Sequence, residues 1–378
     1  MKKQILILFM ALFALGSTQV YAQPPAEIIL PPTPLDETCI DLEDPLNVVA
    51  GQPYTYEVSV PSPPGDKTYH WFVTQDTQFI EDGGIVATSE VLETSTILAA
   101  GSAHYDTPTV DEETIELTFQ SFTLAEDDYV FVVIYVENED DCITNNLKVY
   151  RIQPLHAFTL DIANIDFTDW TLADDPFEQC IDDVQDASFD PTHGANGGVV
   201  YDFGQNTFYY VVAAANFSGG YQLSYQFDGL QGPTADGALG QQAIITWHND
   251  LPELVAGTGS LGTTTITDDE TTGAVLGVIP VQNVDGFVGS DGEMLYIQIV
   301  IEHRQFEGAD DQDSWEYNFA LDGVLVDDAN NPLNPDDFGD LFHDTCDRDP
   351  FHNAVAQVLT ARPTILPVDP DEFLPNAP

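Results

Sequence analysis

The stretch that decides the fold is Asp127–Pro154, which reads DDYVFVVIYVENEDDCITNNLKVYRIQP. It contains a long apolar run, a short acidic turn with a cysteine, and a second β-prone run that reaches a proline. This pattern is typical of two antiparallel strands joined by a turn. We therefore predict that the stretch is the closing hairpin of a β-sandwich in the first half of the chain.

Short β-prone runs precede this hairpin, and turn signals separate them. Tyr54–Val60 alternates aromatic or apolar residues with polar ones and stops at the turn sequence PSPPGD. Lys67–Gln75 follows, and its alternation predicts Tyr69, Trp71 and Val73 on one face. Strands at this spacing, without amphipathic helices between them, favour a sandwich. Three further runs complete the predicted set: Ile85–Ala87, Thr94–Leu98 and Thr114–Phe122.

Two of these strands carry a family resemblance. The alternating run Tyr129–Tyr135, with the acidic turn ENEDDC behind it, resembles the end of a PKD-type immunoglobulin-like domain of secreted Bacteroidota surface proteins. The strand TYHWFV is similar to the Tyr-x-Trp strand of that family. The resemblance spans Cys39–Pro154 and implies an immunoglobulin-like fold in an adhesion or gliding-type surface assembly. The family's Gly-Asp-Gly turn is missing, because Val73, Thr74 and Gln75 stand there.

Both faces of the central strand are apolar. We take Tyr129, Phe131, Val133 and Tyr135 as the inward set, yet the alternate residues on the other face are four branched aliphatics: Val130, Val132, Ile134 and Val136. A solvent-facing set usually carries polar residues. We therefore expect the second face to be covered as well, by the second domain or, alternatively, by another molecule.

The N-terminus has the features of an export signal. Lys2 and Lys3 precede the apolar run Ile5–Leu15, and Val20-Tyr21-Ala22 fits a small-x-small cleavage site. We expect residues 1–22 to be a signal peptide and the mature protein to lie at the cell surface or outside the cell, with the periplasm as an alternative. No membrane span is expected after the signal. Residues 23–38 are rich in proline, so we expect an extended leader that is not part of a core.

The chain is strongly acidic, with 64 acidic and 8 basic residues and a formal net charge of −56. Nucleic-acid binding depends on neutralising phosphates, so the composition excludes nucleic acid as a partner. An acidic, solvated surface also keeps an exported protein soluble.

Four cysteines are present, Cys39, Cys142, Cys180 and Cys346. An even, sparse set in an exported protein indicates disulfides, and four cysteines allow three pairings. We favour Cys39–Cys142 and Cys180–Cys346, because each pair would then bracket one domain.

The second domain is predicted to be a larger β-sandwich over residues 156–362, after a first domain over residues 39–155. Its strand signals predict two hairpins, one from Thr207–Phe217 and Tyr221–Asp228, and another from Met294–His303 and Ser314–Leu321. Residues 363–378 read as a proline-rich acidic tail. Four more strands are predicted: Ala243–His248, Thr263–Thr267, Ala274–Val281 and Val355–Ala361.

No motif indicates a reaction. Gly257–Gly262 reads GTGSLG, but strand and turn residues follow it where a dinucleotide site needs a helix, so we interpret it as a loop. No G-x-S-x-G, H-E-x-x-H or P-loop sequence occurs. The histidines are scattered, and His248 near Asp250 or His343 beside Asp344 would be single ligands.

Acidic loops are the candidate ion sites. Calcium needs six to eight oxygen ligands, and the loop Gln305–Asp313 offers Glu307, Asp310, Asp311 and Asp313. Asp327–Asp340 is a second acidic loop. Neither has an EF-hand spacing, and a chain this acidic forms such clusters by chance. We therefore expect no cofactor, with calcium as an alternative.

The predicted function is that of an exported, non-enzymatic structural or interaction protein, whose partners are other cell-envelope or surface proteins. A carbohydrate-binding module is the first alternative, with a glycan partner and an exposed aromatic row on a sheet face. A secreted hydrolase is the second, and it would need a cleft with two perturbed carboxylates.

Overall fold

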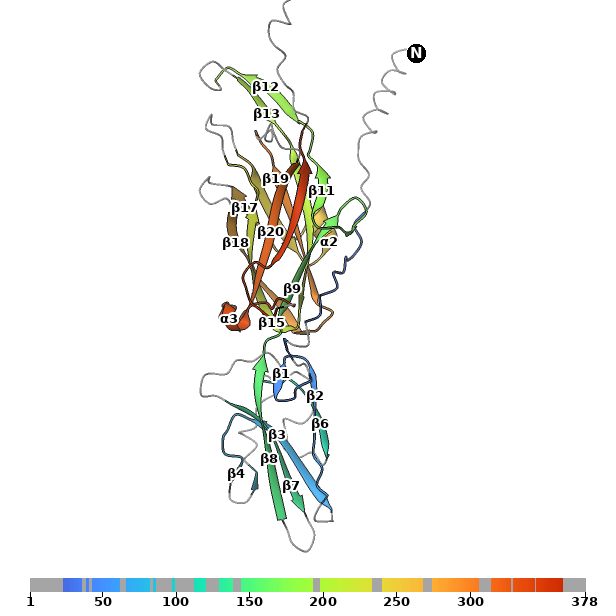
Figure 1. Cartoon of the computed structure of the whole chain (residues 1–378), viewed down its shortest axis with the longest axis vertical. Helices are drawn as coiled ribbons and strands as arrows, with labels where there is room; N and C mark the ends of the chain where they lie inside the picture. Colours follow the sequence, from blue (N-terminus) through green and yellow to red (C-terminus); the bar gives the residue numbers. More distant parts are fainter. Residues whose placement is uncertain are drawn as a thin grey trace, which may run out of the picture.

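The computed structural model describes residues 23–35, 39–40, 43–61, 66–81, 84–85, 97–98, 112–119, 129–138, 144–192, 198–232, 240–267, 274–305, 314–327, 329–343 and 345–362. These residues form two bodies of β-strands that follow one another along the long axis (Figure 1). The fold is all-β, with two β-sandwich domains, and this confirms the predicted class.

The first domain packs a four-stranded sheet against a pair of strands. Its core contains Trp71, whose Nε1 donates to the carbonyl of Glu112 at 2.9 Å, and Tyr69 and Val73 lie beside it as predicted. The sheet has the order β1 (Asn47–Val49), β8 (Thr144–Leu155), β7 (Val130–Asn138) and β3 (Lys67–Thr74). The facing pair is β2 (Pro53–Glu57) and β6 (Thr114–Thr118), and a small ribbon joins β4 (Ile80–Glu81) to β5 (Gly84–Ile85).

The predicted closing hairpin is confirmed, but its faces are exchanged. β7 pairs antiparallel with β8, and both faces of β7 are largely buried. The aliphatic set Val130, Val132, Ile134 and Val136 faces the sandwich core, whereas Val133 packs on the other face. Period-two alternation separates two faces without saying which is inner when both are apolar.

The cover over the outer face of β7 also differs from the prediction. Phe79 packs edge-on against Phe131 with ring centroids 5.1 Å apart, and Leu147 and Val149 of β8 lie in the same cluster with Phe72. Because all of these side chains belong to the first domain, the second domain is not the cover we expected.

The second domain contains two larger sheets that face each other. Among the described strands of this domain, the edge strand β11 alone pairs in parallel, as β1 does in the first domain. The six-stranded sheet has the order β10 (Thr171–Leu172), β9 (Thr159–Asp166), β14 (Gln205–Ala215), β19 (Glu293–Glu302), β16 (Gln242–His248) and β17 (Gly262–Thr267). The five-stranded sheet has the order β11 (Phe177–Cys180), β21 (Asn353–Thr360), β20 (Ser314–Leu325), β15 (Phe217–Asp228) and β18 (Ala274–Val288).

Both predicted hairpins of the second domain are wrong. β14 and β19 belong to the six-stranded sheet, whereas β15 and β20 belong to the five-stranded sheet. Each predicted pair therefore crosses from one sheet to the other. Between β14 and β15 the crossing occurs at Asn216, whose φ of 58° lies in the left-handed region that asparagine tolerates. Two facing sheets bury alternate residues just as a hairpin does, so the strand pattern was right while the pairing was not.

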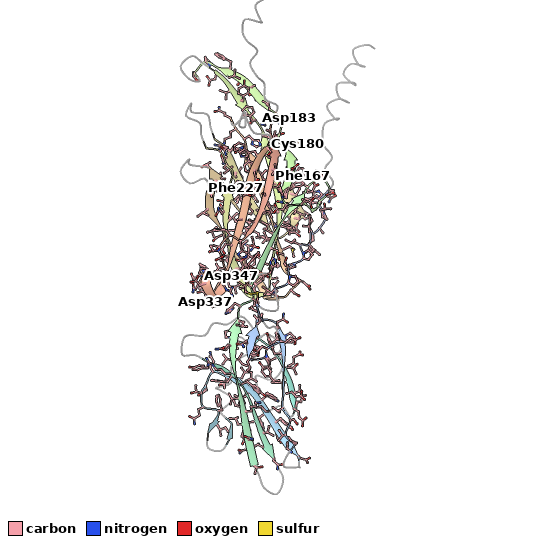
Figure 2. The ribbon with its side chains drawn as sticks, in the orientation of Figure 1. Phe167, Cys180, Asp183, Phe227, Asp337 and Asp347 are labelled. Carbon is pink, nitrogen blue, oxygen red and sulfur yellow. A yellow bond between two sulfur atoms is a disulfide. The ribbon has the colours of Figure 1, made fainter. Side chains whose placement is uncertain are left out.

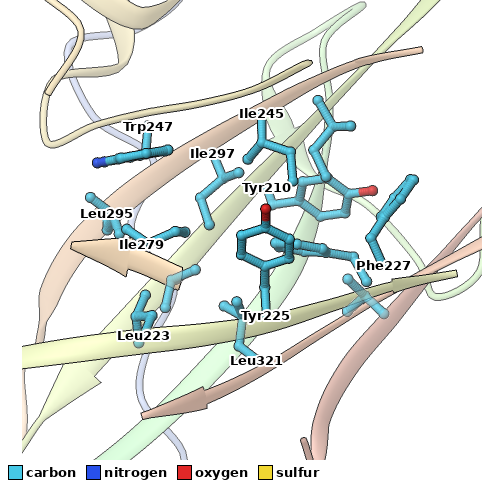
Figure 3. Close-up of a cluster of buried hydrophobic side chains, with 14 of the residues drawn as sticks. Tyr210, Leu223, Tyr225, Phe227, Ile245, Trp247, Ile279, Leu295, Ile297 and Leu321 are labelled. Atoms are coloured by element: carbon cyan, nitrogen blue, oxygen red, sulfur yellow. The ribbon is translucent and has the colours of Figure 1, made fainter. Parts of the chain in front are cut away.

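The interior of the second domain is filled by side chains from both sheets. Figure 3 shows Tyr210, Ile245 and Ile297 of the six-stranded sheet meeting Tyr225 and Phe227 of the five-stranded sheet. The predicted core faces of β19 and β20 lie in this cluster, with Trp315 partly buried at its margin. Burial of about 25 cal/mol per Å² of apolar surface makes this cluster the main stabilising element of the domain.

The N-terminal segment belongs to the second domain. Ile28 is buried with Trp170 and Tyr296 in a separate cluster. The Tyr296 hydroxyl accepts from the Ile28 N–H and donates to the Ile28 carbonyl, both at 3.1 Å. Thr33 donates its N–H and its hydroxyl to the carboxylate of Asp161. Our expectation of a leader that is not part of a core is therefore wrong for this part of residues 23–38.

The disulfide pairing also differs from the prediction. Cys39 is bonded to Cys346, with 5.1 Å between the Cα atoms, and Cys180 is an exposed free thiol. Cys142 lies outside the described residues. The prediction of one disulfide in each domain assumed that the leader makes no contact with the second domain. The leader instead runs along that domain and brings Cys39 to Cys346.

The described residues include two helices, α2 (Leu251–Ala256) and α3 (Pro335–Phe338), and neither is long enough to cross a membrane.

Candidate functional site

The first candidate site is a buried polar cluster at the end of the second domain that meets the first. Asp340 is its centre: Oδ1 accepts from the Gly323 N–H at 2.7 Å, and Oδ2 accepts from the Asn353 amide at 2.7 Å. Nε2 of His352 lies 3.1 Å from the same Oδ2. We call these residues, with Asp322 and Arg348, the junction cluster.

The charges in the junction cluster influence one another. Burial and the neighbouring Asp340 charge raise the pKa of Asp322 to about 6. Burial lowers the pKa of His352, but the hydrogen bond to Asp340 and its charge outweigh burial, so the net shift is upward. Burial and the positive charge of Arg348 lower the pKa of His156 to about 4.

Arg348 connects this cluster to the start of the second domain. Its guanidinium donates to the carbonyl of His156 at 2.8 Å and to the carbonyl of Gly339. His156 lies between the end of β8 and the start of β9, so this bond holds the domain connection against the loop that carries Cys346. Because Asp340 is buried and its oxygens are used by protein donors, the cluster is suited to fixing the junction rather than to binding substrate.

The second candidate site is a hollow at the opposite end of the second domain. It has a volume of about 570 Å³ and lies between the strand β13 (Gly198–Asp202) and the ends of β14 and β19. One aromatic ring, carboxylates, amides and one guanidinium line it. The lining residues are Asp182, Gln185, Tyr201, Asp202, Gly204, Gln205, Glu302, Arg304 and Gln305.

Buried side chains support the wall of this hollow. Both ring nitrogens of His303 are hydrogen-bonded. Nδ1 lies 2.9 Å from the amide nitrogen of Gln241, and Nε2 lies 2.8 Å from Oδ1 of Asn206. Gln241 also donates to the Tyr317 hydroxyl at 2.8 Å. Burial, and then the charge of Arg362, lower the pKa of His303 to about 4, so this ring is neutral at neutral pH.

A stack of planar groups borders the hollow. The rings of Tyr201 and Phe203 are stacked with centroids 5.2 Å apart, and the Arg362 guanidinium lies 4.9 Å from the Phe203 centroid. Arg362 also donates to the carbonyls of Asp182 and Phe203, both at 2.6 Å. The aromatic face of Tyr201 is thereby positioned beside the polar lining. Figure 2 labels Asp183 and Cys180 at this end, and Asp337 and Asp347 at the junction end.

The residues singled out from the sequence do not assemble into a catalytic or metal site. The proposed calcium ligands Glu307, Asp310, Asp311 and Asp313 lie outside the described residues. In the second acidic loop, the Asp327 carboxylate accepts from Ala329 and Asn331 of its own turn. No group of three or more histidine, cysteine or acidic side chains with metal-binding geometry occurs among the described residues.

The glycine-rich stretch is a helix end followed by a strand. Gly257 ends α2 in the left-handed conformation, and β17 begins at Gly262, so no helix follows to bind a pyrophosphate. His248 accepts from the Asp250 N–H at 2.7 Å and lies 3.2 Å from Glu253, which makes it part of the helix N-terminus.

Sequence reasoning missed both sites described here. The junction cluster joins residues from β20, the segment before β21 and the first residue of β21, and the hollow joins residues from three separate strands. The segment Asp186–Asp202 contains aromatic and aliphatic residues among aspartates, and this pattern was the one sequence signal that pointed to the site at the far end.

No protein-family model matches the sequence, and no curated protein matches it. Among solved structures, the MSCRAMM protein ACE of Enterococcus faecalis is 10% identical and covers 84% of this chain and 93% of that chain, with a TM-score of 0.19. The fimbrial protein FimP of Actinomyces oris is 9% identical, with coverages of 82% and 66% and a TM-score of 0.19. The collagen-binding domain of RspB from Erysipelothrix rhusiopathiae is 4% identical, with coverages of 83% and 86% and a TM-score of 0.13. At these identities and TM-scores the likeness does not bear on function.

Proposed function

We propose that this protein is an exported, non-enzymatic structural or interaction protein of the cell surface or extracellular space. The observation that carries the proposal is the way its two domains are joined. Residues 23–35 lie on the second domain, the chain then enters the first domain at β1, and it returns from β8 to β9. The polypeptide therefore crosses the junction twice.

Two features make the double crossing rigid. β1 runs parallel to β8 and pairs with it at Asn47–Val49, so the entering and leaving chains are hydrogen-bonded neighbours. The Cys39–Cys346 disulfide then ties the entering chain to the second domain. Domains joined by one linker move relative to one another by default, whereas two crossings and a covalent bond oppose rotation. A stiff rod that holds its far end away from its base suits a protein that acts by contact.

The strongly shifted titratable groups support a role without catalysis. His303 is buried and hydrogen-bonded through both ring nitrogens, and His156 is half-buried with its ring centroid 4.3 Å from that of Phe338. The lowered pKa values of both follow mainly from burial. A catalytic acid or base has to reach a substrate, and the ring of His303 faces packed interior.

Three finer statements belong to the same proposal. We take residues 1–22 as an export signal, the first domain as PKD-like, and the partners as proteins of a Bacteroidota-type envelope. The buried Tyr-x-Trp strand and the disulfide support these statements, because disulfides persist in oxidising compartments outside the cytosol.

The proposal is tested on intact cells and on purified protein together. We expect surface labelling of intact cells to modify the protein, and the pure protein to release no product from panels of polysaccharides, esters and peptides. Product formation that disappears in an Asp202→Asn/Glu302→Gln variant would show that the protein is a hydrolase. Labelling that occurs only after the cells are broken would contradict the surface location.

The lining of the hollow favours one second candidate function, carbohydrate binding. An aromatic ring beside carboxylates, amides and a guanidinium is a set that can stack on a sugar and bond its hydroxyls. A glycan array tests this candidate: a hit that Tyr201→Ala abolishes supports it. A hit that survives this substitution, or no hit at all, counts against it.

A further inference from the structure

The far end of the second domain carries a two-stranded ribbon. It consists of β12 (Asp186–Asp190) and β13, paired antiparallel, and among the described strands no other one pairs with it. Figure 1 shows the ribbon beyond the ends of the two large sheets, on the side away from the first domain. We call residues Asp186–Asp190 and Gly198–Asp202 the apolar ribbon.

The register places four apolar side chains on one face of the ribbon. Phe189 is opposite Val199, and Ala187 is opposite Tyr201. Since residues two apart on a strand share a face, these four lie together. The relative exposure is 67% for Phe189, 46% for Val199 and 43% for Tyr201, so this face is largely in water.

Soluble proteins rarely leave an apolar face of this kind exposed to water. Two-stranded ribbons are marginally stable in water unless a further strand or surface packs on them. Large apolar side chains gathered on one exposed element are typical of an interaction site. The ribbon is therefore suited to being covered by another surface.

The charge around the ribbon determines the kind of surface that fits. Residues 182–202 contain no lysine or arginine, and their carboxylates are Asp182, Asp183, Asp186, Asp190 and Asp202. A second copy of this chain, with the same ribbon and a net charge of −56, would repel it. An apolar surface with lysine or arginine around its margin would pair with these carboxylates.

We propose that the apolar ribbon docks on a different protein that presents an apolar surface rimmed by basic residues. The partner covers Ala187, Phe189, Val199 and Tyr201, and its basic residues meet the ribbon's carboxylates. This inference rests on the proposed function, since it supplies the contact through which a non-enzymatic surface protein acts.

The test uses a defined probe and a matched control variant. The probe is a fluorescent peptide of alternating leucine and lysine, which presents one apolar and one cationic face as a strand, and a leucine–glutamate peptide is its counterpart. The test variant is Phe189→Ser/Val199→Ser. The control is Leu276→Ser/Val278→Ser on β18, where the two side chains are 65% and 49% exposed and thus comparable. Binding is measured by anisotropy in enough salt to screen non-specific attraction.

We expect the lysine peptide to bind the wild-type chain. We expect its affinity for the ribbon variant to be at least about tenfold lower, because two apolar contacts are lost. The control variant keeps wild-type affinity, and the glutamate peptide does not bind. Equal affinity of all three proteins, or equal loss in both variants, overturns the proposal. Self-association of the wild type that the ribbon variant abolishes also overturns it, because a second copy is then the occupant.

A charge reversal provides an independent test that keeps the apolar face. In Asp186→Lys/Asp190→Lys we expect preference to move from the lysine peptide to the glutamate peptide, and an unchanged preference contradicts the proposal. Surface labelling and the hydrolysis panel are scored separately. A negative peptide result with positive labelling therefore refutes the ribbon's role and leaves the proposed function standing.

Discussion

The two ends of the second domain are built in opposite ways. At the junction end, the titratable side chains Asp340, His352 and Arg348 are engaged with protein groups, and a disulfide ties the N-terminal segment to the domain. At the far end, Phe189 and Tyr201 are exposed and a hollow stays open beside them. The same sandwich therefore fixes one end covalently and presents the other to solvent.

This difference assigns different roles to polar residues of the same type. An aspartate such as Asp340 stabilises the fold because its oxygens satisfy buried donors, and removing it leaves those donors unpaired. An aspartate such as Asp183 at the far end is solvated and is free to attract a partner. We therefore expect substitutions at the junction end to change stability, and those at the far end to change binding.

The largest effect is expected from removing the disulfide. Chain entropy for residues 307 positions apart gives a contribution on the order of 5 kcal/mol, less any structure retained in the unfolded state. We expect Cys39→Ser/Cys346→Ser to lower the free energy of unfolding by about 3–5 kcal/mol, measured by denaturant titration. Cys180→Ser, at the exposed free thiol, is the control and should leave it unchanged. Equal stability of all three proteins would show that the junction does not depend on the bond.

The next effect is expected at Asp340. Asp340→Ala leaves the Gly323 N–H and the Asn353 amide without their acceptor, so we expect a loss of about 3 kcal/mol in the free energy of unfolding. Asp340→Asn retains one acceptor oxygen and should lose less. The matched substitution at the other end, Asp183→Ala, should change it by less than about 0.5 kcal/mol. Similar losses for Asp340→Ala and Asp183→Ala would remove the distinction between the ends.

The pH dependence sharpens the comparison. The pKa of His303 is about 4 in the fold and ordinarily near 6.5, so between these values the unfolded state binds more protons. The stability from His303 is therefore present above pH 6.5 and is lost as the pH falls toward 4. His156 behaves likewise, whereas Asp322, with its pKa raised to about 6, contributes below its ordinary pKa and loses that contribution as the pH rises through 6.

Denaturant titration of the wild type and of His303→Gln between pH 7 and pH 4 measures this effect. We expect the wild type to lose up to about 1.4 kcal/mol per pH unit more than the variant in that window, which corresponds to one proton. Parallel curves for the two proteins would show that His303 is not held neutral by burial.

The smallest effect on stability is expected at the apolar ribbon. Phe189 is mostly exposed, so we expect Phe189→Ser to change the free energy of unfolding by less than about 0.5 kcal/mol. The same assay with Phe319→Ser, in the core of the second domain, should show a loss of several kcal/mol. A large loss at Phe189 would mean that the ribbon packs against its own domain.

Much of the fold could be predicted from the sequence because strands have a period of two. β3, β7, β19 and β20 were located from their alternation, and the faces of β3 and β19 point to the core as expected. That β14 and β15 belong to different sheets could not be derived, since a strand that faces another sheet alternates in the same way as a strand of a hairpin. The inner face of β7 could not be derived either, because both of its faces are apolar.

The sites were harder to predict, for a different physical reason. The pairing of Cys39 depended on the path of residues 23–35, and that path is fixed by single contacts such as Ile28 with Tyr296. The hollow gathers residues more than a hundred positions apart, and the junction cluster brings one end of β20 to the segment before β21, in both cases without a local motif. Asp340 and His303 have no sequence signal that separates them from the other acids and histidines of the chain.

The rigidity of the junction is tested most directly by measuring the distance between the two domains in solution. Spin labels on unnatural side chains at Glu57 and Glu316, both exposed, avoid the cysteines and report this distance by pulsed electron paramagnetic resonance. The double crossing and the Cys39–Cys346 bond predict one narrow distance distribution in the oxidised protein, which broadens after reduction. A broad distribution in the oxidised protein, unchanged by reduction, would contradict a rigid rod.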